Sequence, residues 1–191
     1  MMTRIGFVRH GITDWNLENR IQGQTDIPLN DTGRKQAHAL ANRLKGEEWD
    51  VLYASDLIRA RETAEIVAAA MGVSVRTDPR LREMNCGAVE GTTQEERIAR
   101  WGENWKSLPL NIESKESIVD RGLSFTSYLL ANYQDSSVLV FSHGALLRLT
   151  LKQLIPQVDT RERLRNSAIT TLVHFAGSWD CELYNCTKHI S

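Results

Sequence analysis

The order of apolar and polar residues predicts strands and helices in alternation from the start of the chain. Residues 3–8 (T-R-I-G-F-V) form a short apolar run that predicts a buried strand ending at Arg9. In residues 32–44 the apolar side chains recur at helical spacing, so they share one face of a helix that Asp31 can cap. Residues 50–55 (D-V-L-Y-A-S) predict the next strand.

A second helix follows this strand directly. It covers residues 56–71, where Ser55 or Asp56 can cap its first turn and Gly72 closes it. A short run rich in β-branched residues, 73–77, comes next. The first part of the chain therefore alternates strand, helix, strand and helix.

The pattern becomes irregular over residues 84–112. Thr92 and Glu95 have the spacing of a capping box, which predicts a polar helix running toward Trp101 and Trp105. These two tryptophans fit either a substrate lid or an anchor that holds the segment to the core, and the sequence favours neither. We expect this segment and the shape of the pocket to set substrate selectivity.

Regular patterning returns in the second half. Residues 117–133 predict a long amphipathic helix, and 137–141 (S-V-L-V-F) form a continuous apolar run typical of a strand buried on both faces. A helix over 145–154 follows. Two late runs, 168–175 and 180–185, predict an antiparallel pair at the sheet edge. The fold class is therefore α/β, a three-layer α/β/α sandwich with a mostly parallel sheet and an antiparallel edge.

The composition is that of an ordinary globular domain. The 191 residues are 41% hydrophobic and 25% charged, with a net charge of -1, which argues against disorder and against a surface for nucleic acid. The N-terminus lacks the apolar segment of a signal peptide, and no apolar run reaches membrane-spanning length. We therefore expect one cytoplasmic domain over 1–191, with no nucleic-acid or membrane partner and with an oligomeric state, monomer or homodimer, that the sequence leaves open.

The cysteines predict neither a disulfide framework nor a metal centre. Cys86, Cys181 and Cys186 are few and odd in number, which suits a reducing compartment. Cys181, Cys186 and His189 would leave a zinc ion without a fourth ligand, and their spacing matches no zinc pattern. Ordinary packing is the better interpretation.

Candidate chemistry gathers at the ends of two predicted strands. In open α/β folds ligands bind beyond the carboxyl ends of the strands, and this rule brings Arg9-His10-Gly11 and Ser142-His143-Gly144 to one rim. Arg59, in the first turn of a helix, reaches the same edge. Either His-Gly pair alone would be unremarkable. Two arginines beside two histidines in an almost neutral chain indicate a bound anion, and phosphate suits guanidinium forks.

Ordered motifs around these residues resemble those of the histidine phosphatase superfamily, the family of phosphoglycerate mutases and related phosphatases. They cover most of the chain, and together they are specific. The motifs are R-H-G at 9–11, N-x-x-x-R-x-Q-G at 16–23, D-x-P-L-N-x-x-G-x-x-Q-A at 26–37, S-D-L-x-R-A-x-x-T-A at 55–64, L-R-E-x-x-x-G-x-x-E-G at 81–91 and S-H-G at 142–144.

The resemblance implies a phosphoglycerate mutase-like fold and a role for each residue of the site. His10 would be the nucleophile that forms a phosphohistidine, with Gly11 leaving room for the phosphate. Glu83 would be the general acid, with Glu90 as its rival. The residues implied to hold the phosphate are Arg9, Asn16, Gln22, Gly23, Arg59, His143 and Gly144, with His143 protonated in that role.

The chain also departs from the family pattern. Ile12 replaces a glutamate often found after R-H-G, and Val89 replaces an aromatic residue before E-G. The chain has little room for the longer middle insertion and tail of the glycolytic mutases. An open site admits water, so we expect a phosphatase of broad range that acts on small phosphomonoesters without cofactor or metal. A cofactor-dependent phosphoglycerate mutase and an alpha-ribazole phosphatase are alternatives, and a non-catalytic binder of phosphorylated ligands ranks below them.

Other polar residues are interpreted as structural. His38 and His174 lie within a predicted helix and strand. The basic run 161–165 alternates with acidic residues and leucine, which predicts a solvated surface.

Overall fold

The computed structural model describes residues 2–190, and within them a six-stranded sheet has the order β3-β2-β4-β1-β5-β6. The neighbours from β3 to β1 are parallel, whereas β5 is antiparallel to both β1 and β6. The predicted mostly parallel sheet with an antiparallel edge is confirmed. The strands are β1 (Met2–Arg9), β2 (Val51–Ala54), β3 (Val75–Thr77), β4 (Ser137–Ser142), β5 (Ile169–Phe175) and β6 (Ser178–Cys186).

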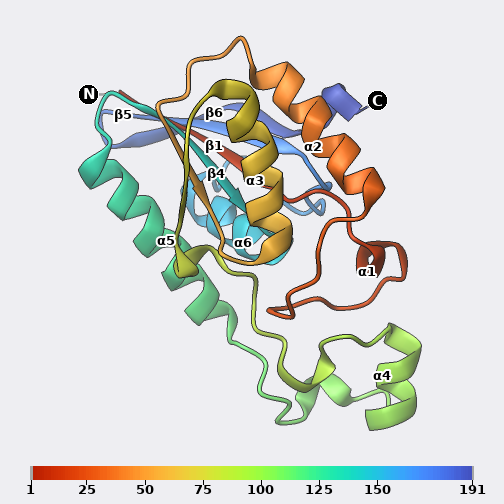
Figure 1. The fold of residues 1–191 in the computed structure, drawn as a ribbon. Coiled ribbons are helices and arrows are strands. Elements are labelled where there is room, and N and C mark those ends of the chain that lie inside the picture. Colours follow the sequence, from red (N-terminus) through yellow and green to blue (C-terminus); the bar gives the residue numbers. More distant parts are fainter. Residues whose placement is uncertain (1, 191) are drawn as a thin grey trace.

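Helices cover both faces of the sheet and give three layers (Figure 1). In β4, Val138 and Val140 pack on one side while Leu139 and Phe141 pack on the other, which explains the continuous apolar run. The helices are α1 (Asp14–Leu17), α2 (Asp31–Leu44), α3 (Ile58–Met71), α4 (Gln94–Trp101), α5 (Lys115–Asn132) and α6 (Gly144–Leu154), of which α2 and α3 cover one face and α5 and α6 the other.

The helix ends differ from the prediction in two places near the site. The side chain of Asn30, not Asp31, caps α2 by accepting a hydrogen bond from the Gly33 N–H. Neither Ser55 nor Asp56 caps α3, whose N-cap is Leu57 without a side-chain hydrogen bond. Asp56 is instead paired with a distant arginine, so a tertiary contact takes the side chain that local chemistry would have placed at the cap.

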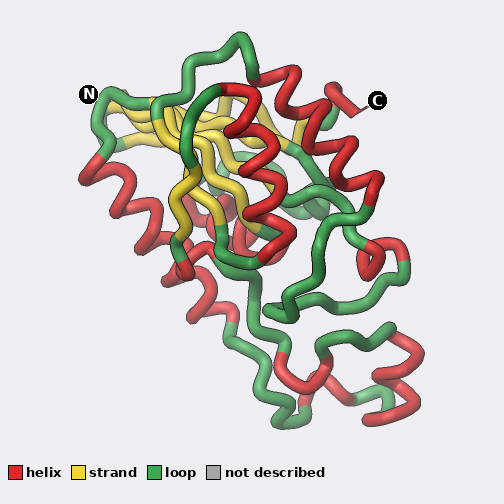
Figure 2. Tube along the Cα trace, in the orientation of Figure 1, coloured by secondary structure: helices red, strands yellow, loops and turns green. Residues whose placement is uncertain are grey.

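Residues 84–112, which include α4, form an arm that extends away from the sheet and is joined to the body mostly by loops (Figure 2). Its capping box is one residue later than predicted: Thr93 and Glu96 form it, while the Thr92 hydroxyl donates to the Val89 carbonyl. Arg20 ties the arm to the body through Glu96 at 2.7 Å. Among residues 2–190, no helix is long and apolar enough to cross a membrane.

Candidate active site

The two His-Gly pairs meet at the carboxyl ends of neighbouring strands. Arg9 pairs with Ser142 in the register of β1 and β4, so His10 and His143 leave the sheet side by side with ring centroids 5.3 Å apart. Both histidines are buried, with 2% and 0% of their surface exposed. The structure thus brings together two motifs separated by 130 residues of sequence.

The His10 ring is held in one orientation and one tautomer. Its Nδ1 lies 2.6 Å from the Gly11 carbonyl oxygen; a carbonyl only accepts, so Nδ1 carries the proton and Nε2 keeps its lone pair. The Asn166 amide donates to the His10 carbonyl and fixes the backbone there. Burial lowers the pKa of His10 well below its usual value, and the charges of Arg59 and Arg9 lower it further. The free protein therefore presents a neutral imidazole.

Two arginines flank this ring, of which Arg59 is buried and Arg9 is partly buried. Arg59 is fully buried and donates to the carbonyls of Thr25 at 2.9 Å and Gly23 at 2.7 Å. Arg9 donates to the Leu164 carbonyl at 2.6 Å. Burial lowers the pKa of Arg59 to about 10, so its guanidinium stays charged at neutral pH. In each, Nε lacks a hydrogen-bond partner among the described residues.

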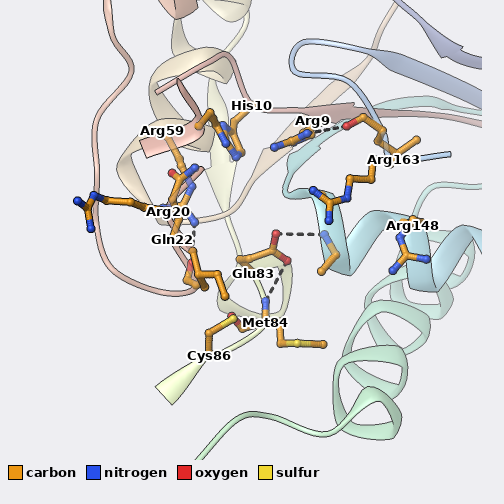
Figure 3. Close-up of a pocket in the computed structure, with 16 residues that line it drawn as sticks. Arg9, His10, Arg20, Gln22, Arg59, Glu83, Met84, Cys86, Arg148 and Arg163 are labelled. Carbon is orange, nitrogen blue, oxygen red and sulfur yellow. Dashed lines mark hydrogen bonds between the residues drawn. The ribbon is translucent and has the colours of Figure 1, made fainter. Parts of the chain in front are cut away.

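These groups line a cavity of about 350 Å³ (Figure 3). Besides Arg9, His10 and Arg59, its wall includes Asn16, Gln22, Gly23, Glu83 and Gly144. The Oε1 atom of Gln22 is buried and has no partner within residues 2–190. Because buried polar atoms are nearly always hydrogen-bonded, unpartnered atoms on Arg9, Arg59 and Gln22 indicate that a polar ligand completes this site.

His143 lies beside His10. It does not line the cavity but packs against the His10 ring, and neither of its ring nitrogens has a partner in the described part of the chain. Burial lowers the pKa of His143 well below its usual value, with the charge of Arg59 the next cause. Without a ligand, His143 is therefore neutral.

Glu83 lies in the cavity wall at the start of α6. Its carboxylate accepts hydrogen bonds from the backbone N–H groups of Ala145, Leu146 and Met84, at 3.0 to 3.1 Å. These bonds aim one carboxyl group at the space beside His10 and Arg59.

Glu90, the alternative candidate for the general acid, does not line the cavity, and its carboxylate instead accepts hydrogen bonds from backbone N–H groups. It accepts from the N–H groups of Gln24, Thr25 and Cys86, all at 2.9 Å, and from the Thr25 hydroxyl at 2.6 Å. A side chain at Gly23, which has φ of 52°, would collide with the Glu90 carboxylate. Glu90 and Gly23 together hold the turn that accepts from Arg59.

Gly11 has a different purpose from the one expected. Its φ is not among the positive values, and a Cβ there would lie 2.6 Å from the Gly33 carbonyl oxygen. We expected Gly11 to make room for the phosphate. In the structure the absence of a side chain at Gly11 lets the loop after β1 pack against the start of α2. At Gly144 a Cβ would come within 3.3 Å of Arg9 Nε, so a small residue there does leave the guanidinium clear.

Asn16 has its side-chain oxygen occupied by local contacts. That oxygen accepts from Thr13 and from the Asn166 amide, so Asn166 connects Asn16 to the His10 loop. Asn166 was not among the predicted site residues.

Three further arginines line the cavity and were not predicted as site residues: Arg20, Arg148 and Arg163. Arg163 belongs to the basic run 161–165, which the sequence presented as a solvated surface; it is exposed, as that interpretation predicts, and it also lines the cavity. Charge alternation gave no signal, because only the contact of this loop with Arg9 brings it to the site.

Trp105 lines a neighbouring recess of about 890 Å³, which shares Arg9, Arg20 and Arg163 with the cavity. The Arg97 guanidinium lies over its ring, 5.0 Å from the centroid. Trp101 contacts Arg100 in the same way and is not in either lining. Trp105 therefore borders the approach to the site, and Trp101 does not.

Comparison with known proteins agrees with this geometry. The model of the histidine phosphatase superfamily (branch 1) matches residues 5–187. The chain belongs to this family. It is 33% identical over 193 residues to "Uncharacterized phosphatase PhoE" of Bacillus subtilis, with 100% of this chain and 98% of the relative covered.

Two further similarities extend the comparison within this superfamily. The chain is 35% identical over 206 residues to "Probable phosphoglycerate mutase GpmB" of Yersinia enterocolitica, covering 99% of this chain and 95% of the relative. It also resembles a phosphoserine phosphatase from Entamoeba histolytica, solved in complex with 3-phosphoglyceric acid, with a TM-score of 0.84, 28% identity, and coverage of 99% and 100%. This protein is thus an enzyme of the histidine phosphatase superfamily with phosphatases among its relatives.

Proposed function

We propose that this protein hydrolyses small phosphomonoesters, over a broad range, through a phosphohistidine intermediate on His10. The observation that carries the proposal is the neutral, buried His10 ring, whose Nδ1–H is bound to the Gly11 carbonyl beside two arginines with unpartnered Nε atoms. A lone pair at Nε2 is what attack on phosphorus requires. Relatives described as phosphatases support the same reaction.

The reaction proceeds in two steps that share one acid-base group. His10 Nε2 bonds to phosphorus as the bond to the leaving oxygen breaks, and Glu83 in its protonated form gives that oxygen a proton. Glu83 then takes a proton from water, whose oxygen bonds to phosphorus while the bond to Nε2 breaks. Proton transfers of this kind contribute about 10²–10⁴-fold to the rate.

The phosphate oxygens are held by charge and by dipoles already in place. Arg9 and Arg59 supply two guanidiniums, and their burial strengthens each interaction with the dianion. Asn16, Gln22, Gly23 and Gly144 line the same space. Entry of a dianion offsets the burial and the arginine charges that lower the pKa of His143, so we infer that His143 takes up a proton as the phosphate binds.

The proposed reaction needs no metal ion, because arginines neutralise the charge that a metal would otherwise hold. The residues 2–190 contain no group of three or more histidine, cysteine, aspartate or glutamate side chains placed to hold one. A phosphoglycerate mutase is the second candidate, favoured by the similarity to GpmB. It differs only in what accepts the phosphoryl group from His10.

The test is hydrolysis of p-nitrophenyl phosphate and a panel of phosphomonoesters, with chelator present and bisphosphoglycerate absent. Wild type should release phosphate and His10→Ala should lose turnover, because its side chain has no atom to receive the phosphoryl group. Rapid quench should trap an acid-labile phosphoenzyme in wild type only. Mutase activity that requires bisphosphoglycerate, with negligible hydrolysis, would overturn the proposal.

A further inference from the structure

Glu83, the proposed general acid, lies on a segment without regular secondary structure. It follows the short 3-10 turn Pro79–Leu81, and the next turn begins only at Gly87. The Glu83 carboxylate accepts from backbone N–H groups of its neighbour Met84 and of α6, but these bonds fix its position only if the backbone that carries it stays in place. Backbone polar groups of such a segment need partners from elsewhere in the fold.

Arg121, in the middle of α5, binds this backbone directly. Its Nη1 donates to the carbonyls of Arg80 at 2.7 Å and Arg82 at 3.0 Å. Its Nη2 donates to the Glu83 carbonyl at 3.3 Å, which within residues 2–190 has one other donor, the Gln24 amide at 3.1 Å. One planar guanidinium therefore fixes three carbonyls of the segment that carries the acid.

Glu113 holds the Arg121 guanidinium and the far end of the same segment. Its two carboxylate oxygens accept from Arg121 Nε at 2.9 Å and from Nη2 at 3.0 Å. Glu113 also accepts from the Asn85 N–H at 3.0 Å, and its own N–H donates to the Asn85 carbonyl at 2.8 Å. Arg121 and Glu113, which we call the clamp, thus hold the backbone on both sides of Glu83.

The clamp is shielded from water but does not reach the cavity. The side chains of Arg121 and Glu113 are 23% and 12% exposed. Burial raises the pKa of Glu113, but hydrogen bonds from Arg121, Asn85 and Ser117 outweigh it and bring the pKa below its usual value, so the ion pair is intact at neutral pH. Because neither clamp residue lines the cavity, the clamp acts on the site through the backbone of Glu83.

We propose that Arg121, held by Glu113, is a positioning residue that keeps Glu83 within reach of the leaving oxygen of the substrate. The inference rests on the proposed function, since it assumes that Glu83 protonates that oxygen. Displacing a catalytic group by about 1 Å can cost about 10²-fold in rate. Loss of the guanidinium frees three carbonyls at once, and the backbone of residues 80–83 is then no longer held to α5 by this side chain.

The test compares two esters whose leaving oxygens differ in their need for a proton. p-Nitrophenolate is a stable anion that departs without one, whereas the alkoxide of an alkyl phosphomonoester leaves only as it is protonated. The alkyl ester is the one that wild type hydrolyses fastest, with glycerol 3-phosphate as the first choice. In Arg121→Gln its kcat/KM should fall by about 10–100-fold, while kcat/KM for p-nitrophenyl phosphate changes little. A general loss of folded protein would lower both values equally.

Two further variants make the test independent of how well Arg121→Gln folds. Glu113→Gln weakens the grip on Arg121 and should show the same selective loss at smaller size. Because the two residues act as one unit, the double variant should lose less than the sum of the single effects on a free-energy scale. Arg34→Gln removes an arginine that is paired with Glu62 and Asp31 and does not contact the segment, so it should leave both kcat/KM values unchanged.

The outcomes separate this inference from the proposed function. If wild type hydrolyses no phosphomonoester, the proposed function is overturned and the positioning role with it. If wild type hydrolyses both esters but Arg121→Gln and Glu113→Gln lose the same factor on each, or lose nothing on either, the clamp serves stability alone. That result overturns the positioning role and leaves the proposed function standing.

Discussion

Single residues with the same chemistry have different surroundings in this protein, and the surroundings decide what each can do. Glu83 and Glu90 lie seven positions apart in one motif. Glu83 faces the cavity, whereas both oxygens of Glu90 accept bonds that hold the 23–25 turn. Arg163 and Arg165 differ in the same way, one in the wall of the cavity and the other ion-paired with Glu162.

Replacing each glutamate by glutamine separates chemistry from structure. Glu83→Gln should lower kcat by about 10²–10⁴-fold, because an amide cannot transfer the proton. Glu90→Gln should instead reduce the free energy of unfolding by about 1–3 kcal/mol, because its amide nitrogen cannot accept a hydrogen bond from the buried turn. Steady-state kinetics and urea unfolding of both variants check this. Normal turnover in Glu83→Gln with lost turnover in Glu90→Gln at full stability would exchange the two roles.

At the scale of elements, the position of the site depends on how closely the helices pack and on where each helix begins. Gly122 in α5 lies against Thr150 in α6, the helix that begins at Gly144. A Cβ at Gly122 would lie 3.0 Å from the Thr150 Cβ and 3.1 Å from its Cγ2. These two helices can approach this closely only because one of them has no side chain at the contact.

Gly122→Ala tests this contact against helix propensity. Alanine in a helix interior is favoured over glycine by about 1 kcal/mol, but overpacking costs about 1–3 kcal/mol, so the variant should be destabilised or at best neutral. Ser127→Ala, an exposed position of the same helix, should be neutral or slightly stabilised. Thermal or urea unfolding measures both. A clear gain in stability for Gly122→Ala would show that the two helices separate without cost.

At the scale of the whole molecule, both histidines of the site follow strands of one sheet and are buried when the protein folds. The free energy of unfolding therefore depends on their protonation. Residues 1–191 are proposed to form one domain, which predicts a single cooperative unfolding transition. His10 and His143 are buried in the folded protein, and their pKa values are well below the usual one. In the unfolded chain the same histidines have a pKa of about 6.5. Below that pH the unfolded state binds more protons, so stability is lost as pH falls.

The loss should approach about 1.4 kcal/mol per pH unit for each histidine between pH 6.5 and 5. Urea unfolding across this range measures it. Inorganic phosphate should reduce the slope by favouring the protonated form of His143. Replacing both buried histidines by glutamine should flatten the slope, and His38→Gln, at an exposed position, should leave it unchanged. A stability that is constant from pH 7 to 5 in wild type would contradict the assigned burial.

The local pattern of apolar and polar residues predicted the strands and helices correctly where burial alone decides the structure. The alternation of apolar runs and amphipathic segments predicted the sheet and its covering helices, and Gly72 closes α3 with φ of 71° as expected. The caps at Asp31, Ser55 or Asp56 and Thr92 were wrong, because neighbouring polar residues compete for the same orphan N–H groups. At Asp56 a tertiary ion pair with Arg82 decides that competition, and at Thr92 a local hydrogen bond to the Val89 carbonyl decides it.

By itself, the sequence determined the order of strands and helices and the motifs at the ends of β1 and β4, because periodicity and glycine placement are local properties. It also determined the family, whose motifs are ordered along the chain. Only the tertiary structure decided which side chains share the cavity. It tied Arg9 to the Leu164 carbonyl, next to Arg163, made the Glu90 carboxylate an acceptor for backbone N–H groups and left Arg148 without a hydrogen bond or ion pair among residues 2–190. Those outcomes depend on the distance between residues remote in sequence, and no local pattern carries that information.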